Sequence, residues 1–198
     1  MTHLKSMLTL VITVITFSTF AQDGFTPRAQ GNFLANGSIG IISTSEKAKF
    51  EGTTSDVGST FQITATPKVG YFITDNIVAG LEIEVRTSTT KFEGIDEKVT
   101  SDGIAVGPFA GYMFDNGLFA EATVGFGSNK TSTIIGDIES SVFAIRGTAG
   151  YAFFFGDHIS VEPAINYTNQ SQKPKGGDGD NKTILNTIFF SAGFTAYF

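Results

Sequence analysis

The sequence predicts an all-β fold, an eight-stranded antiparallel up-and-down barrel, from three observations. The composition combines 23 glycines and 20 phenylalanines with no tryptophan and no cysteine, which is typical of strands and turns rather than long helices. A hairpin motif recurs around Asp75, Asp115 and Asp157, which lie 40 and 42 residues apart. Between these turns, apolar and polar residues alternate with the period of a strand.

The N-terminal residues predict export. Lys5 precedes the apolar run MLTLVITVITF, and small residues lead to Ala21, so residues 1–21 resemble a secretory signal peptide cleaved before Gln22. The run is shorter than the ~20 residues that a membrane-spanning helix needs. Residues 22–29 are then a short N-terminal lead, and residues 30–198 are the barrel domain. Because the chain has no cysteine, backbone pairing and packing must hold the exported domain together.

The charge balance argues against nucleic acid as a partner. Without Lys5 the mature chain has 12 basic residues against 19 acidic ones, a net charge of −7. A phosphate-binding surface needs a basic patch that this chain does not have.

Each short turn follows a related phrase: PKVGYF, PFAGYMF and GTAGYAF, and the chain ends on SAGFTAYF as a fourth copy. The aromatic residues in register are Tyr71, Tyr112, Tyr151 and Phe194, each preceded by glycine. The end of the chain therefore falls where the next short turn is expected, and we expect the barrel to be complete at that point.

The strands follow in order along the chain. They are expected at about 32–42, 61–71, 77–86, about 104–114, 118–127, 143–153, 159–167 and about 184–198. Long polar stretches at 43–60, 88–103, 128–141 and 169–182 alternate with the short turns. This asymmetry is typical of a transmembrane β-barrel with short periplasmic turns and four long external loops. An even number of strands places both chain ends on the periplasmic side.

The phase of each strand predicts which face meets lipid. Charge is excluded from the odd positions of 61–71, 77–85, 143–153 and 159–167, and from the even positions of 118–126 and 188–198. These faces carry the repeated aromatic residues, so Tyr71, Tyr112, Tyr151 and Phe194 are expected to form an aromatic girdle at the periplasmic interface.

The opposite face carries charges that would lie in the lumen. They are Lys68, Arg86 and Arg146 with Glu82, Glu84, Glu121 and Glu162. A turn centred near residue 75 places Lys68 opposite Glu82 on the neighbouring strand. Buried charges must be paired, and eight strands leave an interior that side chains just fill, so an internal salt-bridge plug is favoured over an ion-conducting lumen.

Three prolines oppose the simplest form of this prediction. Pro67, Pro108 and Pro163 lie inside expected strands, and a closed barrel has no free edge for a residue without an N–H group. A local bulge or a wide hydrogen-bond site is expected at each.

The signal peptide, the eight strands, the G-Y phrases before the short turns and the terminal Phe198 together resemble the small outer-membrane β-barrel domain family of Gram-negative bacteria, which includes OmpA-type transmembrane domains and OmpX. The resemblance implies a location in the cell outer membrane, contact with outer-membrane lipid, and recognition of the last strand by the barrel-insertion machinery through Phe190, Phe194 and Phe198. OmpA continues into a peptidoglycan-binding domain that this sequence does not contain, so wall anchoring is not expected.

Candidate catalytic and metal sites are few. His158 lies beside Asp157 and near Ser160, but a solvated turn histidine is the simpler interpretation, because adjacent strand residues point to opposite faces. Asp178 and Asp180 have a calcium-like spacing, but Lys182 occupies the next ligand position. We therefore expect no enzyme activity, no cofactor and no metal.

Three functions stay open. The favoured one is a non-enzymatic envelope component or surface scaffold whose external loops contact a surface ligand. A narrow channel or transporter for small solutes is the alternative. A soluble lipocalin-like binder is the third, disfavoured because its apolar residues would line the inside.

Overall fold

A computed structural model of the chain describes residues 25–50, 53–94, 98–133, 136–175 and 182–198. The expected signal peptide and the Asp178/Asp180 pair lie outside these residues. The strands are β1 (Phe33–Phe50), β2 (Thr53–Phe72), β3 (Ile77–Phe92), β4 (Lys98–Met113), β5 (Leu118–Thr133), β6 (Gly136–Tyr151), β7 (Phe153–Phe154), β8 (Ile159–Pro174) and β9 (Thr183–Tyr197). Within the described ranges, no helix has the length and apolar character needed to cross a membrane.

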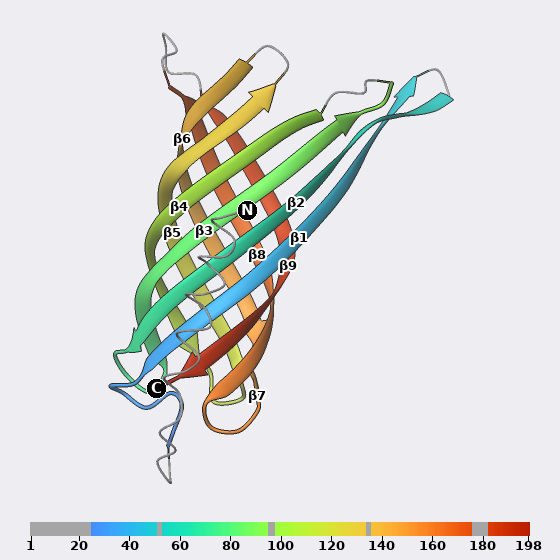
Figure 1. Cartoon of the computed structure of the whole chain (residues 1–198). Coiled ribbons are helices and arrows are strands. Elements are labelled where there is room, and N and C mark those ends of the chain that lie inside the picture. The colour runs from blue at the N-terminus through green and yellow to red at the C-terminus, as the bar shows by residue number, and fades with distance from the viewer. Residues whose placement is uncertain (1–24, 51–52, 95–97, 134–135, 176–181) are drawn as a thin grey trace, which may run out of the picture.

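The strands form one closed antiparallel sheet in which each strand pairs with the next along the chain, except that β6 and β7 both pair with β8. β7 continues β6 against β8 in the same register, since Gly150 is opposite Ala164 and Phe153 is opposite Val161. The sheet closes where β1 pairs with β9, from Leu34 opposite Tyr197 to Gly40 opposite Ser191. Counting β6 and β7 as one strand, the predicted eight-stranded up-and-down barrel is confirmed (Figure 1).

An apolar band surrounds the outside of the barrel. Its most exposed members include Phe190, Phe194 and Ile188, which expose 74, 67 and 65% of their surface. On each strand the band covers a stretch of at least nine residues, the length that a tilted strand needs to cross a bilayer. These stretches are 33–41, 63–71, 77–85, 104–112, 118–126, 143–151, 159–167 and 188–196. Apolar residues on the outside contradict the lipocalin-like alternative.

On the side opposite the short turns, where the sequence predicts long external loops, the strands continue well beyond this band. β1 and β2 stay paired as far as Phe50 opposite Thr53, and β5 and β6 as far as Thr133 opposite Gly136. These segments are rich in threonine and serine, whose side chains suit a sheet that meets water on both faces. Cross-strand hydroxyl contacts such as Thr60–Thr90, at 2.9 Å, support the pairing. The external connections are therefore mainly paired hairpins rather than irregular loops.

The three prolines interrupt the ladder on one side only. Pro67 pairs with Gly37 on β1, while the ladder to β3 stops at Ala65 and resumes at Lys68. The same pattern occurs at Pro108 toward β5 and at Pro163 toward the β6–β7 junction. The register is the same before and after each gap, so no bulge forms at these prolines and this part of the expectation is wrong. Each proline leaves one local gap in the hydrogen-bond ladder because it lacks an N–H group.

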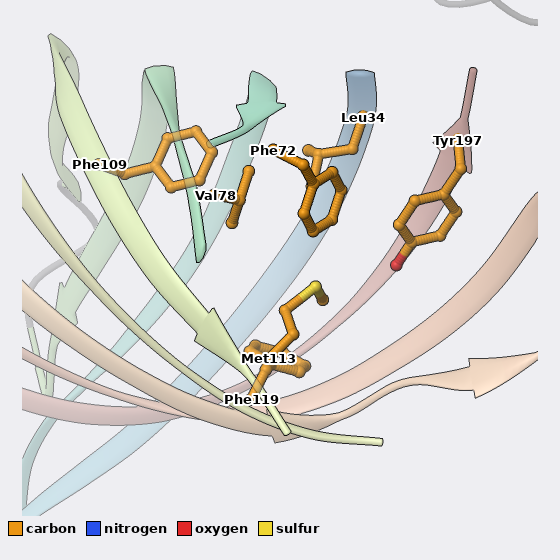
Figure 2. Packing of buried hydrophobic residues seen from close by; sticks show 7 residues of the cluster. All are labelled: Leu34, Phe72, Val78, Phe109, Met113, Phe119 and Tyr197. Atoms are coloured by element: carbon orange, nitrogen blue, oxygen red, sulfur yellow. The ribbon is translucent and has the colours of Figure 1, made fainter. Parts of the chain in front are cut away.

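An apolar cluster fills the lumen at the end with the short turns. Its members come from six strands and are each at most 4% exposed: Leu34, Phe72, Val78, Phe109, Met113, Phe119 and Tyr197. Figure 2 shows these side chains pointing inward from the surrounding strands. The inside of the barrel is thus apolar at the end with the short turns and becomes polar above it.

Candidate functional site

The seven charged residues expected in the lumen lie inside the barrel, directly above the apolar cluster. Lys68, Glu82, Arg146 and Glu162 are all less than 10% exposed. The side chains of Glu84, Arg86 and Glu121 are 13, 17 and 6% exposed. The strand period places them there, because each alternates with a residue of the outward apolar band.

Lys68 on β2 reaches across the lumen to Glu121 on β5. Its Nζ donates to both carboxylate oxygens of Glu121, at 2.6 Å to Oε1. The same Nζ lies 5.1 Å from the ring centre of Phe109, whose face attracts a cation. Because β3 and β4 separate the two strands in the sheet, this ion pair spans the interior and does not join adjacent strands.

Arg146 on β6 forms the second connection across the lumen. Its guanidinium contacts Glu82 through Nη2 and Glu84 through Nη1, the latter at 2.7 Å. Arg86 approaches the same Glu84 at 3.6 Å. Glu82 and Glu84 are two residues apart on β3 and therefore face the same side, which allows one planar fork to bind both.

The expected pairing of Lys68 with Glu82 is correct as a register and wrong as an ion pair. The two residues are opposite on β2 and β3. However, Glu82 forms its ion pair with Arg146, and Lys68 forms its ion pair with Glu121. In a narrow barrel, side chains from opposite walls meet at the axis, so the partner is not set by the adjacent strand.

Glu162 has no cationic partner among the described residues and is held by neutral donors instead. Ser160 and the Tyr197 hydroxyl donate to Oε1, at 2.7 and 3.1 Å, and Asn36 donates to Oε2 at 3.1 Å. Three hydrogen bonds can stabilise a buried carboxylate that lacks a counter-charge. Asn36, Ser160 and Tyr197 did not figure among the residues expected at the site.

Little open space remains between the Lys68–Glu121 pair and the Arg146 connection. The cavity between the ion pairs has a volume of about 20 Å³ and is lined by residues including Lys68, Glu82, Glu121, Arg146 and Glu162. That volume suits roughly one water molecule.

The N-terminal lead crosses the end of the barrel that carries the short turns. Phe25 packs against the apolar cluster and stacks on His158, with ring centres 4.1 Å apart. Arg28 donates to the Phe114 carbonyl at 2.6 Å, and the Gln30 amide donates to Asp75 at 2.8 Å. We call residues 25–32 the strap. It contacts three different short turns and covers the apolar cluster, which we also call the apolar floor.

His158 is not the solvated turn histidine expected from the sequence. Besides stacking on Phe25, its Nδ1 lies 3.0 Å from the Tyr197 carbonyl oxygen, and the residue is half-buried. Ser160 donates to Glu162 rather than to His158. Among the described residues, no group of three or more His, Cys, Asp or Glu could hold a metal.

The aromatic residues of the expected girdle face outward, at different levels. Tyr71 is opposite Phe33 on β1, and their rings are 5.0 Å apart. Phe33 in turn exchanges both backbone hydrogen bonds with Phe198, at 2.9 Å each. Tyr71, Phe33 and Phe198 therefore lie side by side at one level of the barrel wall. Phe194 is opposite Gly37 and lies four residues further along the strand.

The other members of the aromatic set lie near the short turns. Tyr112 packs edge-on against Phe114, and Tyr151 packs against Phe153, with ring centres 4.8 and 4.6 Å apart.

Comparison with known proteins agrees with this geometry. The model of the outer membrane protein beta-barrel domain family matches residues 80–198, more than half of the chain. The chain belongs to this family. It is accordingly an outer-membrane protein surrounded by lipid.

The comparison with solved structures returns other outer-membrane proteins. OprG from Pseudomonas aeruginosa is 17% identical, with 86% of this chain and 98% of that chain covered and a TM-score of 0.47. Neisserial surface protein A is 16% identical, with 85 and 98% covered and a TM-score of 0.47. AlkL is 17% identical, with 90 and 92% covered and a TM-score of 0.42. No curated protein matches.

Sequence reasoning missed two parts of the site in this outer-membrane barrel, the apolar floor and the strap. One signal was available for the floor: Phe72, Phe119 and Tyr197 are large residues on the inward phase, and all lie next to short turns or the chain end. The strap has no comparable signal, because residues 25–32 show no strand or helix period.

Proposed function

We propose that this protein is a sealed, non-enzymatic barrel of the cell envelope that serves as a surface scaffold for its external hairpins. The observation that carries the proposal is the pair of ion-pair connections across the lumen, Lys68–Glu121 and Arg146 with Glu82 and Glu84, around a cavity of about 20 Å³. A hydrated ion has no room to pass between them.

Two further layers support a sealed interior. Below the ion pairs, the described residues of the apolar cluster are hydrocarbon or thioether side chains apart from Tyr197, whose hydroxyl is bound to Glu162, so they offer little to replace the hydration shell of an ion. Below the cluster, the strap lies across the periplasmic end. Ions or small polar solutes would have to displace three different structures to cross.

The scaffold part of the proposal rests on the external hairpins. They extend the sheet beyond the apolar band and carry exposed charges such as Lys130, Asp137 and Glu139. A paired hairpin holds its side chains in a fixed array, which suits contact with a surface ligand better than an irregular loop does. We propose that any partner of this protein outside the cell binds there.

Planar-bilayer recording tests the seal. Refolded wild-type protein should give no steady conductance steps, and a heat-unfolded sample serves as the control for nonspecific leaks. Reproducible steps of one size from folded protein alone would contradict the seal and favour the channel alternative.

The external location of the hairpins is tested by cysteine labelling, for which the cysteine-free chain is well suited. Lys98→Cys, at the external end of β4, should react with a membrane-impermeant maleimide on intact cells. Asp157→Cys, in a short turn, should react only after the outer membrane is opened. The reverse labelling would show that the short turns face outward and would overturn the scaffold proposal.

A further inference from the structure

A hollow of about 420 Å³ opens at the periplasmic rim, away from the lumenal charges. It lies between the turn that joins β4 to β5 and the segment around β7, and its lining includes Arg28, Asp115, Asn116, Tyr151 and residues 153–155. This volume is within the usual range of small-molecule sites. The charged and aromatic side chains meet here because the strap carries Arg28 across to this turn.

The hollow holds one cationic and one anionic group. Arg28 is fixed by the Phe114 carbonyl, at 2.6 Å from Nη1, and by the Phe154 ring, whose centre is 6.0 Å from Cζ. Asp115, the next residue after Phe114, accepts one hydrogen bond from Asn76 at 3.2 Å. Neither takes part in an ion pair among the described residues. Both charges therefore remain available to a ligand with two opposite charges.

The position of the hollow relative to the bilayer narrows the class of ligand. Tyr151 is the last residue of β6, and Phe153 and Phe155 follow it toward the turn. Phe153 and Phe155 are 51 and 65% exposed. Exposed aromatic rings beside charged groups at the edge of an apolar band are typical of the membrane interface.

We propose that this hollow binds the headgroup of a phosphatidylethanolamine-type phospholipid from the inner leaflet of the outer membrane. Arg28 would bind the phosphate, since a guanidinium matches phosphate oxygens in geometry and charge. Asp115 would accept hydrogen bonds from the primary ammonium group, and the acyl chains would run along Tyr151, Phe153 and Phe155. A phosphatidylglycerol headgroup has no cationic group to pair with Asp115, and a choline headgroup has a cation but no N–H to donate. This proposal is independent of the sealed lumen.

Native mass spectrometry of the refolded, delipidated barrel tests the proposal with three short-chain probes: dihexanoyl phosphatidylethanolamine, phosphatidylcholine and phosphatidylglycerol. The wild type should retain the ethanolamine lipid best. Arg28→Gln should weaken its binding about tenfold or more, because a charge-assisted hydrogen bond to phosphate is lost. Asp115→Asn should remove the preference for ethanolamine over choline while phosphate binding persists.

Two control variants each remove a charge of the same sign as Asp115 or Arg28 at another place in the barrel. Asp157→Asn removes an exposed carboxylate from a different short turn, and Lys91→Gln removes an exposed cation from the external part of β3; both should bind as the wild type does. Arg28 also holds the strap, so Asp115→Asn, which leaves that contact in place, decides the outcome. Equal retention of the three lipids by the wild type, or an unchanged ethanolamine preference in folded Asp115→Asn, would overturn the proposal.

Discussion

At the scale of single residues, the glycines that precede the repeated aromatics are required by packing inside the barrel. A Cβ atom at Gly150 would lie 2.4 Å from the Phe119 ring and 2.6 Å from the Pro163 carbonyl oxygen. A Cβ atom at Gly70 would lie 2.8 Å from Val78 and 2.9 Å from Phe109. The repeated G-Y phrase therefore pairs a small inward residue, which leaves room for the apolar floor, with a large outward one.

Replacing Gly150 with alanine tests this requirement. The added methyl group meets backbone as well as a buried ring, so Gly150→Ala should lower the free energy of unfolding by about 1–3 kcal/mol. Gly147→Ala is the matched control on the same strand, because a Cβ there meets nothing within 4 Å. Urea unfolding in lipid vesicles measures both. Equal stability of the two variants would mean that the packing at Gly150 can relax.

At the scale of elements, the external hairpins are stabilised by ion pairs that water surrounds. Lys130 on β5 and Asp137 on β6 approach to 2.7 Å outside the membrane-spanning part of the barrel. The hydrogen bond from Lys130, followed by that from Ser132, holds the pKa of Asp137 below its usual 3.8, and Asp137 raises the pKa of Lys130. A carboxyl whose pKa is lowered by folding stabilises the fold above its unfolded pKa, and the contribution disappears as the pH falls through the folded value.

The titration of Asp137 is therefore expected to depend on one particular lysine. By NMR in micelles, the Asp137 carboxyl should titrate below 3.8, and Lys130→Met should raise its midpoint. Lys175→Met, which removes the partner of Glu139 at 3.4 Å, is the control and should leave Asp137 nearly unchanged. A midpoint that does not respond to Lys130→Met would show that the pair does not form in solution.

The last strand leads to a second prediction at this scale. Phe198 closes the barrel through its backbone pair with Phe33, and Phe190 and Phe194 present their rings outward. We propose that these three residues are read by the barrel-insertion machinery. Deleting Phe198 should leave export intact and strongly reduce folded protein in the outer membrane, as measured by fractionation and by gel mobility with and without heating.

A control separates recognition from closure. Phe198→Leu keeps the backbone pair with Phe33 and removes only the aromatic ring, so its assembly should also fall if the ring is recognised. If Phe198→Leu assembles normally while the deletion variant fails to assemble, the role of Phe198 is only to close the barrel through its backbone.

At the scale of the whole molecule, the sequence predicts the barrel well because strand phase and turn spacing are local signals. The outward band and the inward position of Lys68, Glu121 and Arg146 follow from alternation alone. The ion-pair partners do not follow, because Lys68 and Glu121 meet only once the sheet has closed. The strap is likewise held by three turns that are far apart in the sequence. The extent of pairing in the long polar segments does not follow from the sequence either, because threonine- and serine-rich strands with water on both faces have no hydrophobic alternation.

The pairing of Lys68 with Glu121 across the lumen is tested most directly by a double-mutant cycle. Lys68→Met and Glu121→Gln should each lower the free energy of unfolding by ~3 kcal/mol, since each leaves a buried charge without its partner. The double variant should cost clearly less than the sum of the two, whereas Lys68→Met combined with Glu82→Gln should be nearer to additive, because Glu82 pairs with Arg146. The chain has no tryptophan, so circular dichroism in urea follows unfolding. Additive losses for Lys68 and Glu121, or stronger coupling of Lys68 to Glu82, would contradict a lumen closed by this ion pair.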